Sequence, residues 1–157
     1  MEYGVQSQTV THSAEQTVAL GRQLASEFSP PCLVLLEGEL GTGKTTLVNG
    51  IAAGLGAASE EAIASPTFTL MHEYGNPTRV YHVDLYRIED AHDFATLGLD
   101  EIISQNAVVL VEWGERFAKL FPARDFHIKL EHLGLDDRCS TVSAVKRARS
   151  ASTPAGR

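Results

Sequence analysis

One short motif constrains this chain more than any other feature of its sequence. The segment Gly38-Glu-Leu-Gly-Thr-Gly-Lys-Thr45 matches the pattern Gly-x-x-x-x-Gly-Lys-Ser/Thr. It follows an apolar run at residues 32–36, typical of a strand buried on both faces, and it opens a segment with helical spacing at residues 44–55. Residue frequencies give a chance match in about one chain of this length in 200. The order of strand, glycine-rich loop and helix therefore predicts a phosphate-binding loop; the alternative is a glycine-rich turn carrying a surface lysine.

Each residue type in the motif has a physical role in binding phosphate. Glycines let the backbone amides converge on a pyrophosphate, and the following helix directs its N-terminal amides and positive dipole end at the same anion. Lys44 supplies a positive charge for the β- and γ-phosphates, and we expect its side chain to face solvent when no ligand is bound. Thr45 offers a hydroxyl to Mg²⁺. The expected nucleotide-binding residues are Leu40, Gly41, Thr42, Gly43, Lys44, Thr45 and Thr46.

Such a loop needs a carboxylate to hold the metal, and two acidic residues end apolar strand candidates. Glu112 follows the aliphatic run at residues 107–111, and Asp84 ends a second run at residues 79–84. We favour Glu112 as the metal ligand, because its strand is the more uniformly apolar and is therefore expected to be the more central. Asp84 is then a candidate for orienting water or holding a metal-bound water. For either acid, the alternative is a carboxylate that caps a loop.

Trp113 and Thr67 are weaker candidates. Trp113 is the single tryptophan and directly follows Glu112, although a tryptophan is as often a packing residue. Thr67 could sense the γ-phosphate as a switch hydroxyl, or it could simply begin a strand. The six histidines show no metal-binding spacing, so we interpret them as surface or packing residues.

The remaining pattern predicts a layered α/β fold with one inserted antiparallel hairpin. The expected strands are residues 32–36, 67–74, 79–85, 107–111, 126–130 and 138–145, and the expected helices are residues 13–28, 44–55 and 90–97. Residues 1–145 are expected to form a single P-loop ATPase domain. Residues 146–157 are expected to be a flexible, basic, low-complexity tail.

Composition narrows the functional classes. The chain carries 13 basic and 20 acidic residues, a formal net charge of −7, which argues against binding nucleic acid on its own. No apolar run approaches the roughly 18 residues of a spanning helix, so we expect no membrane association. The two cysteines, Cys32 and Cys139, are far apart in sequence and are expected to be reduced, as in a cytoplasmic protein.

The nucleotide and the reaction are constrained by absent motifs. The guanine-reading pattern Asn-Lys-x-Asp does not occur, which favours adenine. No arginine-rich lid of the small-molecule-kinase type stands out, which favours an ATPase. A P-loop kinase remains the alternative. A nucleotide-gated binding module without meaningful hydrolysis is a third hypothesis. Spacing does not choose which arginine neutralises transition-state charge; the candidates are Arg79, Arg87, Arg116 and Arg138.

The ordered motifs resemble the bacterial TsaE (YjeE) family, the ATPase component of tRNA N6-threonylcarbamoyladenosine (t6A) modification. Five blocks carry the resemblance: Gly38-Glu-Leu-Gly-Thr-Gly-Lys-Thr-Thr-Leu47, Ser65-Pro-Thr-Phe-Thr-Leu70, Tyr81-His-Val-Asp-Leu-Tyr-Arg87, Leu97-Gly-Leu-Asp-Glu101 and Val111-Glu-Trp-Gly-Glu-Arg116. The resemblance implies a P-loop NTPase-like three-layer fold with a mixed, mostly parallel central sheet. It also implies Mg²⁺-dependent ATP hydrolysis that is weak alone, depends on the partners TsaB and TsaD, and resets the modification complex, with tRNA contacted only through those partners.

The resemblance further implies roles for individual residues. Lys44 would bind phosphates, Thr45 and Glu112 would coordinate Mg²⁺, and Asp84 would be essential for turnover at the nucleotide. Thr67 and Trp113 would belong to segments that move around the nucleotide or meet the partner, which completes the expected catalytic set of Lys44, Thr67, Asp84 and Trp113. Two positions depart from the family pattern. Gly114 stands where proline is common, which would loosen the turn after Trp113, and Asp137-Arg138 is the nearest match to a C-terminal Gly-Arg, which implies Arg138 as a nucleotide ligand.

Overall fold

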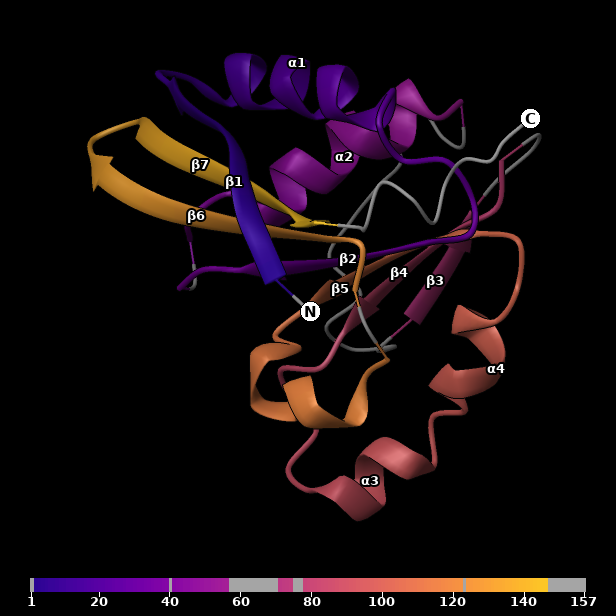
Figure 1. Cartoon of the computed structure of the whole chain (residues 1–157). Coiled ribbons are helices and arrows are strands. Elements are labelled where there is room, and N and C mark those ends of the chain that lie inside the picture. The colour runs from indigo at the N-terminus through magenta and orange to yellow at the C-terminus, as the bar shows by residue number, and fades with distance from the viewer. Residues whose placement is uncertain (1, 40, 57–70, 75–77, 123, 147–157) are drawn as a thin grey trace.

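The computed structural model describes residues 2–39, 41–56, 71–74, 78–122 and 124–146. Within these residues the chain builds one sheet with helices on both faces (Figure 1). Its strands are β1 (Glu2–Thr11), β2 (Cys32–Glu37), β3 (Met71–Tyr74), β4 (Val80–Asp84), β5 (Val108–Glu112), β6 (Phe126–Gly134) and β7 (Asp137–Lys146). Its helices are α1 (Ala14–Ala25), α2 (Lys44–Gly54), α3 (Ala91–Ala95), α4 (Leu99–Ile103) and a 3-10 helix, η2 (Glu115–Leu120).

The sheet has the strand order β1-β7-β6-β2-β5-β4-β3. Strands β6, β2, β5 and β4 are parallel neighbours, whereas β3 on one edge and β7 and β1 on the other are added antiparallel. The mixed α/β sheet and the β3–β4 hairpin expected from sequence are confirmed. Because β2 and β5 are parallel neighbours, the loop after β2 and the residue that ends β5 meet at the same edge of the sheet.

Two apolar cores lie between the three layers, one on each face of the sheet, because alternate residues of each buried strand point to opposite faces. Val34 and Leu36 of β2 face α1 and α2, whereas Leu33 and Leu35 face the layer of α3, α4 and η2. Figure 1 shows α1 and α2 on one side of the sheet and α3 and α4 on the other. The short apolar runs are therefore buried on both faces, as their composition predicts.

The helix that follows the P-loop is held by a close helix crossing. A Cβ added to Gly50 of α2 would lie 2.1 Å from the Val18 carbonyl oxygen of α1, and one added to Gly21 would lie 2.5 Å from the Leu47 carbonyl oxygen. The expected start of α1 is confirmed by its cap, in which the Ser13 hydroxyl accepts a bond from the Gln16 amide at 3.1 Å. This crossing fixes the position of α2, and hence the direction in which its N-terminus points.

Some elements differ from the sequence expectation. No strand is expected at the N-terminus from sequence, but β1 pairs along β7 as an edge strand. Its side chains from Val5 to Thr9 are mostly exposed, so the segment lacks the apolar periodicity on which the prediction relied. Helix α4 and η2 are also unpredicted. Strand β7 runs to Lys146, one residue past the expected domain boundary, and the rest of the expected tail lies outside the described residues.

Two expectations from composition can be compared with the described residues. Cys32 and Cys139 are both buried, and no disulfide bond joins them. None of the helices in the described part of the chain has the length and hydropathy that crossing a bilayer requires.

Candidate functional site

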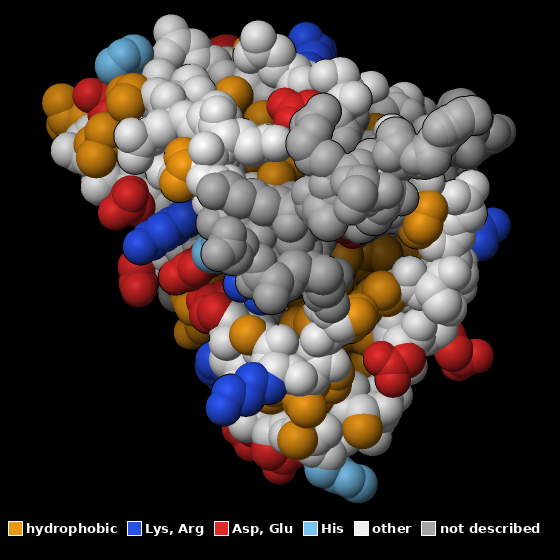
Figure 2. Space-filling view, in the orientation of Figure 1, with side chains coloured by type: hydrophobic (Ala, Val, Ile, Leu, Met, Phe, Trp, Pro, Cys, Tyr) orange, Lys and Arg blue, Asp and Glu red, His pale blue; other side chains and the backbone are white. Residues whose placement is uncertain are grey.

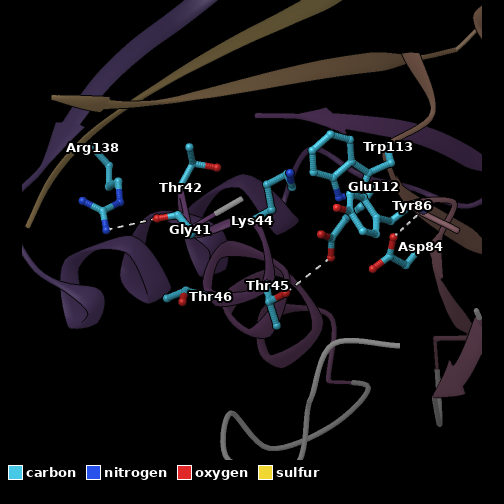
Figure 3. Close-up of a pocket in the computed structure, with 11 residues that line it drawn as sticks. Gly41, Thr42, Lys44, Thr45, Thr46, Asp84, Tyr86, Glu112, Trp113 and Arg138 are labelled. Atoms are coloured by element: carbon cyan, nitrogen blue, oxygen red, sulfur yellow. Dashed lines mark hydrogen bonds between the residues drawn. The ribbon is translucent and has the colours of Figure 1, made fainter. Parts of the chain in front are cut away.

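A pocket of about 380 Å³ lies at the edge of the sheet where the P-loop, β4 and β5 end (Figure 3). The residues that line it are Gly41, Thr42, Gly43, Lys44, Thr45, Thr46, Asp84, Tyr86, Glu112, Trp113 and Arg138. Every described residue that the sequence analysis assigns to the site is in this list. Leu40 and Thr67 lie outside the described residues. Tyr86 is the one lining residue that the sequence analysis does not assign.

The P-loop backbone takes conformations that favour glycine. Gly41 and Gly43 have φ angles of +82° and +97°, in the left-handed region where a side chain is strained. Gly43 occupies the N-cap of α2, and no side chain caps that helix. The first amides of α2 are therefore left to bind a ligand in the pocket, which is the arrangement that anions favour at a helix N-terminus.

Lys44 is not solvent-facing, which corrects the sequence expectation. Its side chain is buried, with the residue 5% exposed, and its ammonium donates a hydrogen bond to the Gly38 carbonyl oxygen. The Nζ atom also lies 3.9 Å from the centroid of the Trp113 ring. Burial lowers the pKa of Lys44, while the charges of nearby acids, Glu112 first, oppose that shift. Spacing in the motif fixed the identity of this lysine but not its burial, because the covering ring belongs to Trp113, directly after β5.

The two strand-end acids lie beside each other at the pocket. Glu112 ends β5, which pairs with β2, and Asp84 ends β4 directly opposite Glu112 in the ladder. Both are 3% exposed. The Thr45 hydroxyl lies 3.5 Å from Glu112 Oε2, and Asp84 Oδ1 accepts a hydrogen bond from the Tyr86 amide at 2.9 Å. The expectation that the β5 strand is nearer the centre of the sheet is confirmed.

These oxygens are suited to a small hard cation. Mg²⁺ prefers oxygen ligands, uses few from the protein, and takes the rest from water and substrate phosphates. The Thr45 hydroxyl and the Glu112 carboxylate fit that donor set. Among the described residues, no group of three His, Cys, Asp or Glu side chains forms a metal site of its own.

His82 is a feature that sequence reasoning missed. Its ring is fully buried, and Nε2 lies 2.5 Å from Glu112 Oε2. From their spacing, the histidines are expected to be surface or packing residues. The available signal was its place two residues before Asp84 in a strand, which puts both side chains on the same face of the sheet.

Trp113 both packs and lines the pocket, so the two alternatives for this residue coexist. It contacts the core beneath the sheet, and its ring centroid is 5.0 Å from that of Tyr86. Its φ of +63° is unusual for a residue with a side chain. Arg116 donates hydrogen bonds to the carbonyl oxygens of Leu85 and Tyr86, at 2.7 and 2.9 Å, and so fixes the segment that carries Tyr86.

Gly114 does not take a glycine-specific conformation, since its φ is −80°. A Cβ added there would lie 3.2 Å from Val111 Cγ1 and 3.3 Å from Phe121 Cε2. Close packing, rather than a left-handed turn, therefore distinguishes this position.

Arg138 is the candidate arginine that the structure brings to the P-loop. It comes from β7, and its Nη2 donates to the Gly41 carbonyl oxygen at 3.3 Å. Arg79 instead bonds Glu73 and Gln105, and Arg116 bonds the carbonyl oxygens after β4. Of the four candidates from sequence, Arg138 alone lines the pocket formed by the described residues.

Comparison with known proteins adds a second line of evidence. A model of the family described as "Threonylcarbamoyl adenosine biosynthesis protein TsaE" matches residues 11–140. The "tRNA threonylcarbamoyladenosine biosynthesis protein TsaE" of Treponema pallidum is 37% identical over 134 residues, 85% of this chain and 98% of that protein. The protein of the same name from Bacillus subtilis is 38% identical over 136 residues, 86% of this chain and 84% of that protein.

A solved structure agrees with these matches. The crystal structure of Bacillus subtilis YdiB superposes with a TM-score of 0.74 at 33% sequence identity, covering 91% of this chain and 88% of that chain. The span matched by the family model contains every residue that lines the pocket.

Proposed function

The chain belongs to the TsaE family of threonylcarbamoyladenosine biosynthesis proteins, and from that membership we propose that it is the Mg²⁺-dependent ATPase subunit of t6A modification. It hydrolyses ATP in complex with TsaB and TsaD and thereby resets the complex between rounds. The observation that carries the proposal is the convergence of the P-loop, the Thr45–Glu112 pair and Asp84 on one pocket.

The loop and α2 bind the phosphates. The uncapped amides at the start of α2 and the positive end of its dipole attract the β-phosphate. The Lys44 ammonium lies at the same wall of the pocket and moves from the Gly38 carbonyl oxygen to the β- and γ-oxygens. Arg138 approaches the loop from β7 and adds a second positive charge.

Thr45 and Glu112 hold the metal. Their oxygens are neighbours, one on α2 and one on β5, so both can ligate a single cation. Bound Mg²⁺ would neutralise negative charge on the β- and γ-phosphate oxygens. The carboxylate comes from a buried strand and is therefore held more rigidly than a loop residue.

Asp84 orients the attacking water. It lies opposite Glu112 at the end of the adjacent strand, and its Oδ1 is fixed by the Tyr86 amide. A carboxylate in this position can accept a hydrogen bond from water and align it for attack. Hydrolysis rather than transfer is proposed because no arginine-rich lid of the small-molecule-kinase type stands out in the sequence.

Dependence on partner proteins agrees with the surface next to the site. Hydrophobic side chains gather at the end of the molecule where β6 and β7 meet (Figure 2), and Leu133 and Leu135 are 56% and 92% exposed there. The Leu135 carbonyl oxygen accepts a bond from Arg138, which also bonds Gly41. A partner that docks on this turn would therefore act on the P-loop through one side chain.

The net charge of −7 fits a subunit that leaves tRNA contact to TsaB and TsaD. A cytoplasmic location, inferred from two cysteines that form no disulfide bond, is part of the same proposal.

Phosphate release, measured with and without TsaB and TsaD from the same organism, tests the function. We expect slow release by the chain alone and clear stimulation by the pair, with the Asp84→Asn variant as the inactive control. Absence of stimulation would count against the ATPase role. Transfer of the γ-phosphate to a metabolite would instead support a small-molecule kinase, and normal t6A formation by a hydrolysis-deficient variant would support a nucleotide-gated binding module.

A further inference from the structure

His82 occupies a position where an apolar residue would be expected. All five residues of β4 are buried, and its neighbours Val80 and Val83 are fully inaccessible. Burying an imidazole among them is unfavourable unless its polar atoms are hydrogen-bonded. Among the residues that the structure describes, the hydrogen-bond partner of the ring is Glu112, whose Oε2 lies 2.5 Å from Nε2. The hydrogen bond to this carboxylate, rather than packing in the apolar core, therefore accounts for a histidine at this position.

The surroundings of the other ring nitrogen, Nδ1, indicate which nitrogen of His82 carries the proton. Nδ1 of His82 is buried and has no hydrogen-bond partner among the described residues. A proton on Nδ1 would be a buried donor without an acceptor, which is costly. The tautomer that carries its proton on Nε2 avoids that cost and donates to Glu112 Oε2.

The same carboxylate oxygen also faces the P-loop helix. Glu112 Oε2 is 3.5 Å from the Thr45 hydroxyl, so it lies between α2 on one side and His82 on the other. In the ladder, His82 pairs with Leu110, which makes Glu112 its diagonal neighbour on the same face of the sheet. One hydrogen bond across two parallel strands thus sets the direction of the carboxylate.

We propose that His82 is a positioning residue, which holds the Glu112 carboxylate beside Thr45 so that the pair can ligate Mg²⁺. The inference rests on the proposed function, because it concerns the metal that accompanies the nucleotide. Partners that hydrogen-bond a metal ligand fix its orientation, and losing them weakens metal affinity about 10–100-fold. His82 touches neither nucleotide nor metal, and it acts through Glu112.

A matched pair of variants separates this role from packing. In His82→Gln the side-chain amide can place an N–H near the position of Nε2, whereas His82→Met has a similar length and no donor. The probe is ADP, titrated at a series of Mg²⁺ concentrations and again in EDTA. Trp113, the single tryptophan and a pocket residue, supplies the fluorescence signal.

In His82→Met we expect the half-saturating Mg²⁺ concentration to rise at least about 10-fold, while ADP affinity in EDTA stays within about 3-fold of wild type. His82→Gln should recover most of the Mg²⁺ response. A normal Mg²⁺ response in a folded His82→Met would overturn the proposal, as would a His82→Gln variant as impaired as His82→Met. A wild-type chain that binds no nucleotide would overturn the proposed function itself.

If His82→Met does not fold, the unaltered chain decides the question. The Nε2–H signal of His82, followed by histidine-selective NMR, should move on addition of Mg²⁺ to the ADP complex and stay in place with EDTA. A signal that is insensitive to Mg²⁺ would refute the positioning role.

Discussion

The Lys44 ammonium lies 3.9 Å from the centroid of the Trp113 ring, so the lysine of the P-loop motif is covered by an aromatic face from the residue that follows β5. Such a contact is worth about 0.5–2 kcal/mol, depending on its desolvation. A triphosphate offers several charged oxygens and can therefore displace the ring and the Gly38 carbonyl oxygen as partners of Lys44. Trp113 is thus placed to respond when a nucleotide binds.

Lys44→Ala should reduce nucleotide affinity by about 100-fold or more, because it removes the positive charge at the β- and γ-phosphates. The fold should survive, since the buried ammonium is replaced by an apolar group. Titration calorimetry with Mg·ATP measures the affinity without relying on Trp113, whose surroundings the change alters. Lys119→Ala, at an exposed position of η2, is the matched control and should bind as wild type.

In Thr45→Val, the gain in nucleotide affinity that Mg²⁺ gives should fall at least about 10-fold. The isosteric side chain lacks the hydroxyl beside Glu112. Thr45→Ser keeps the hydroxyl and should retain the response. Nucleotide affinity measured in EDTA should be similar in both variants. Equal Mg²⁺ dependence in the valine and serine variants would show that this hydroxyl is not a metal ligand.

Asp84→Asn should slow ATP hydrolysis about 100-fold or more while leaving ADP affinity nearly unchanged. The amide oxygen can still accept the hydrogen bond from the Tyr86 amide, so the turn after β4 should keep its shape. Single-turnover phosphate release in the presence of TsaB and TsaD is the measurement. A variant that hydrolyses at the wild-type rate would remove Asp84 from the mechanism.

Gly50→Ala should destabilise the fold by about 3 kcal/mol or more, because the new Cβ would be 2.1 Å from the Val18 carbonyl oxygen at the α1–α2 crossing. For a domain of this size, that corresponds to a drop of about 6–12 °C in the midpoint of thermal unfolding. Gln23→Ala, at an exposed position of α1, should leave the midpoint within about 2 °C. A Gly50→Ala variant as stable as Gln23→Ala would contradict the close crossing.

The stability of the chain should fall as the pH drops below about 6.5, in part through His127. Burial lowers the pKa of His127, and Arg124 adds to that shift, although Glu37, 2.9 Å away, opposes it. A lowered pKa means that the unfolded state binds the proton more readily. The stability contributed by His127 is therefore present above its unfolded pKa and is lost as the pH falls toward the folded value.

Replacing His127 with glutamine tests this pH dependence. Denaturant unfolding at several pH values should give a shallower loss of stability toward acid for His127→Gln than for wild type. Above about pH 8 the two curves should run parallel, because His127 is neutral in both states. An unchanged acid slope would exclude His127 as a contributor.

Motifs of residues that are adjacent in sequence determined much of the fold and the site. The P-loop, the helix after it and the acids Asp84 and Glu112 were all predictable, because each is defined by residues adjacent in sequence. A buried parallel strand needs apolar residues on both faces, and a phosphate loop needs glycine, lysine and a hydroxyl at fixed spacing. The sequence also predicted that Glu112 is the more central acid, from the uniform apolarity of its strand.

The tertiary structure alone decided which distant residues meet at that loop. Arg138 reaches Gly41 from β7, and His82 reaches Glu112 from β4. The ring of Trp113, which follows β5, covers Lys44. Strand order and side-chain direction across the sheet set these contacts, and local spacing does not encode either. Strand β1 was missed for a related reason: an exposed edge strand needs a partner rather than an apolar face, and its partner β7 is at the other end of the described chain.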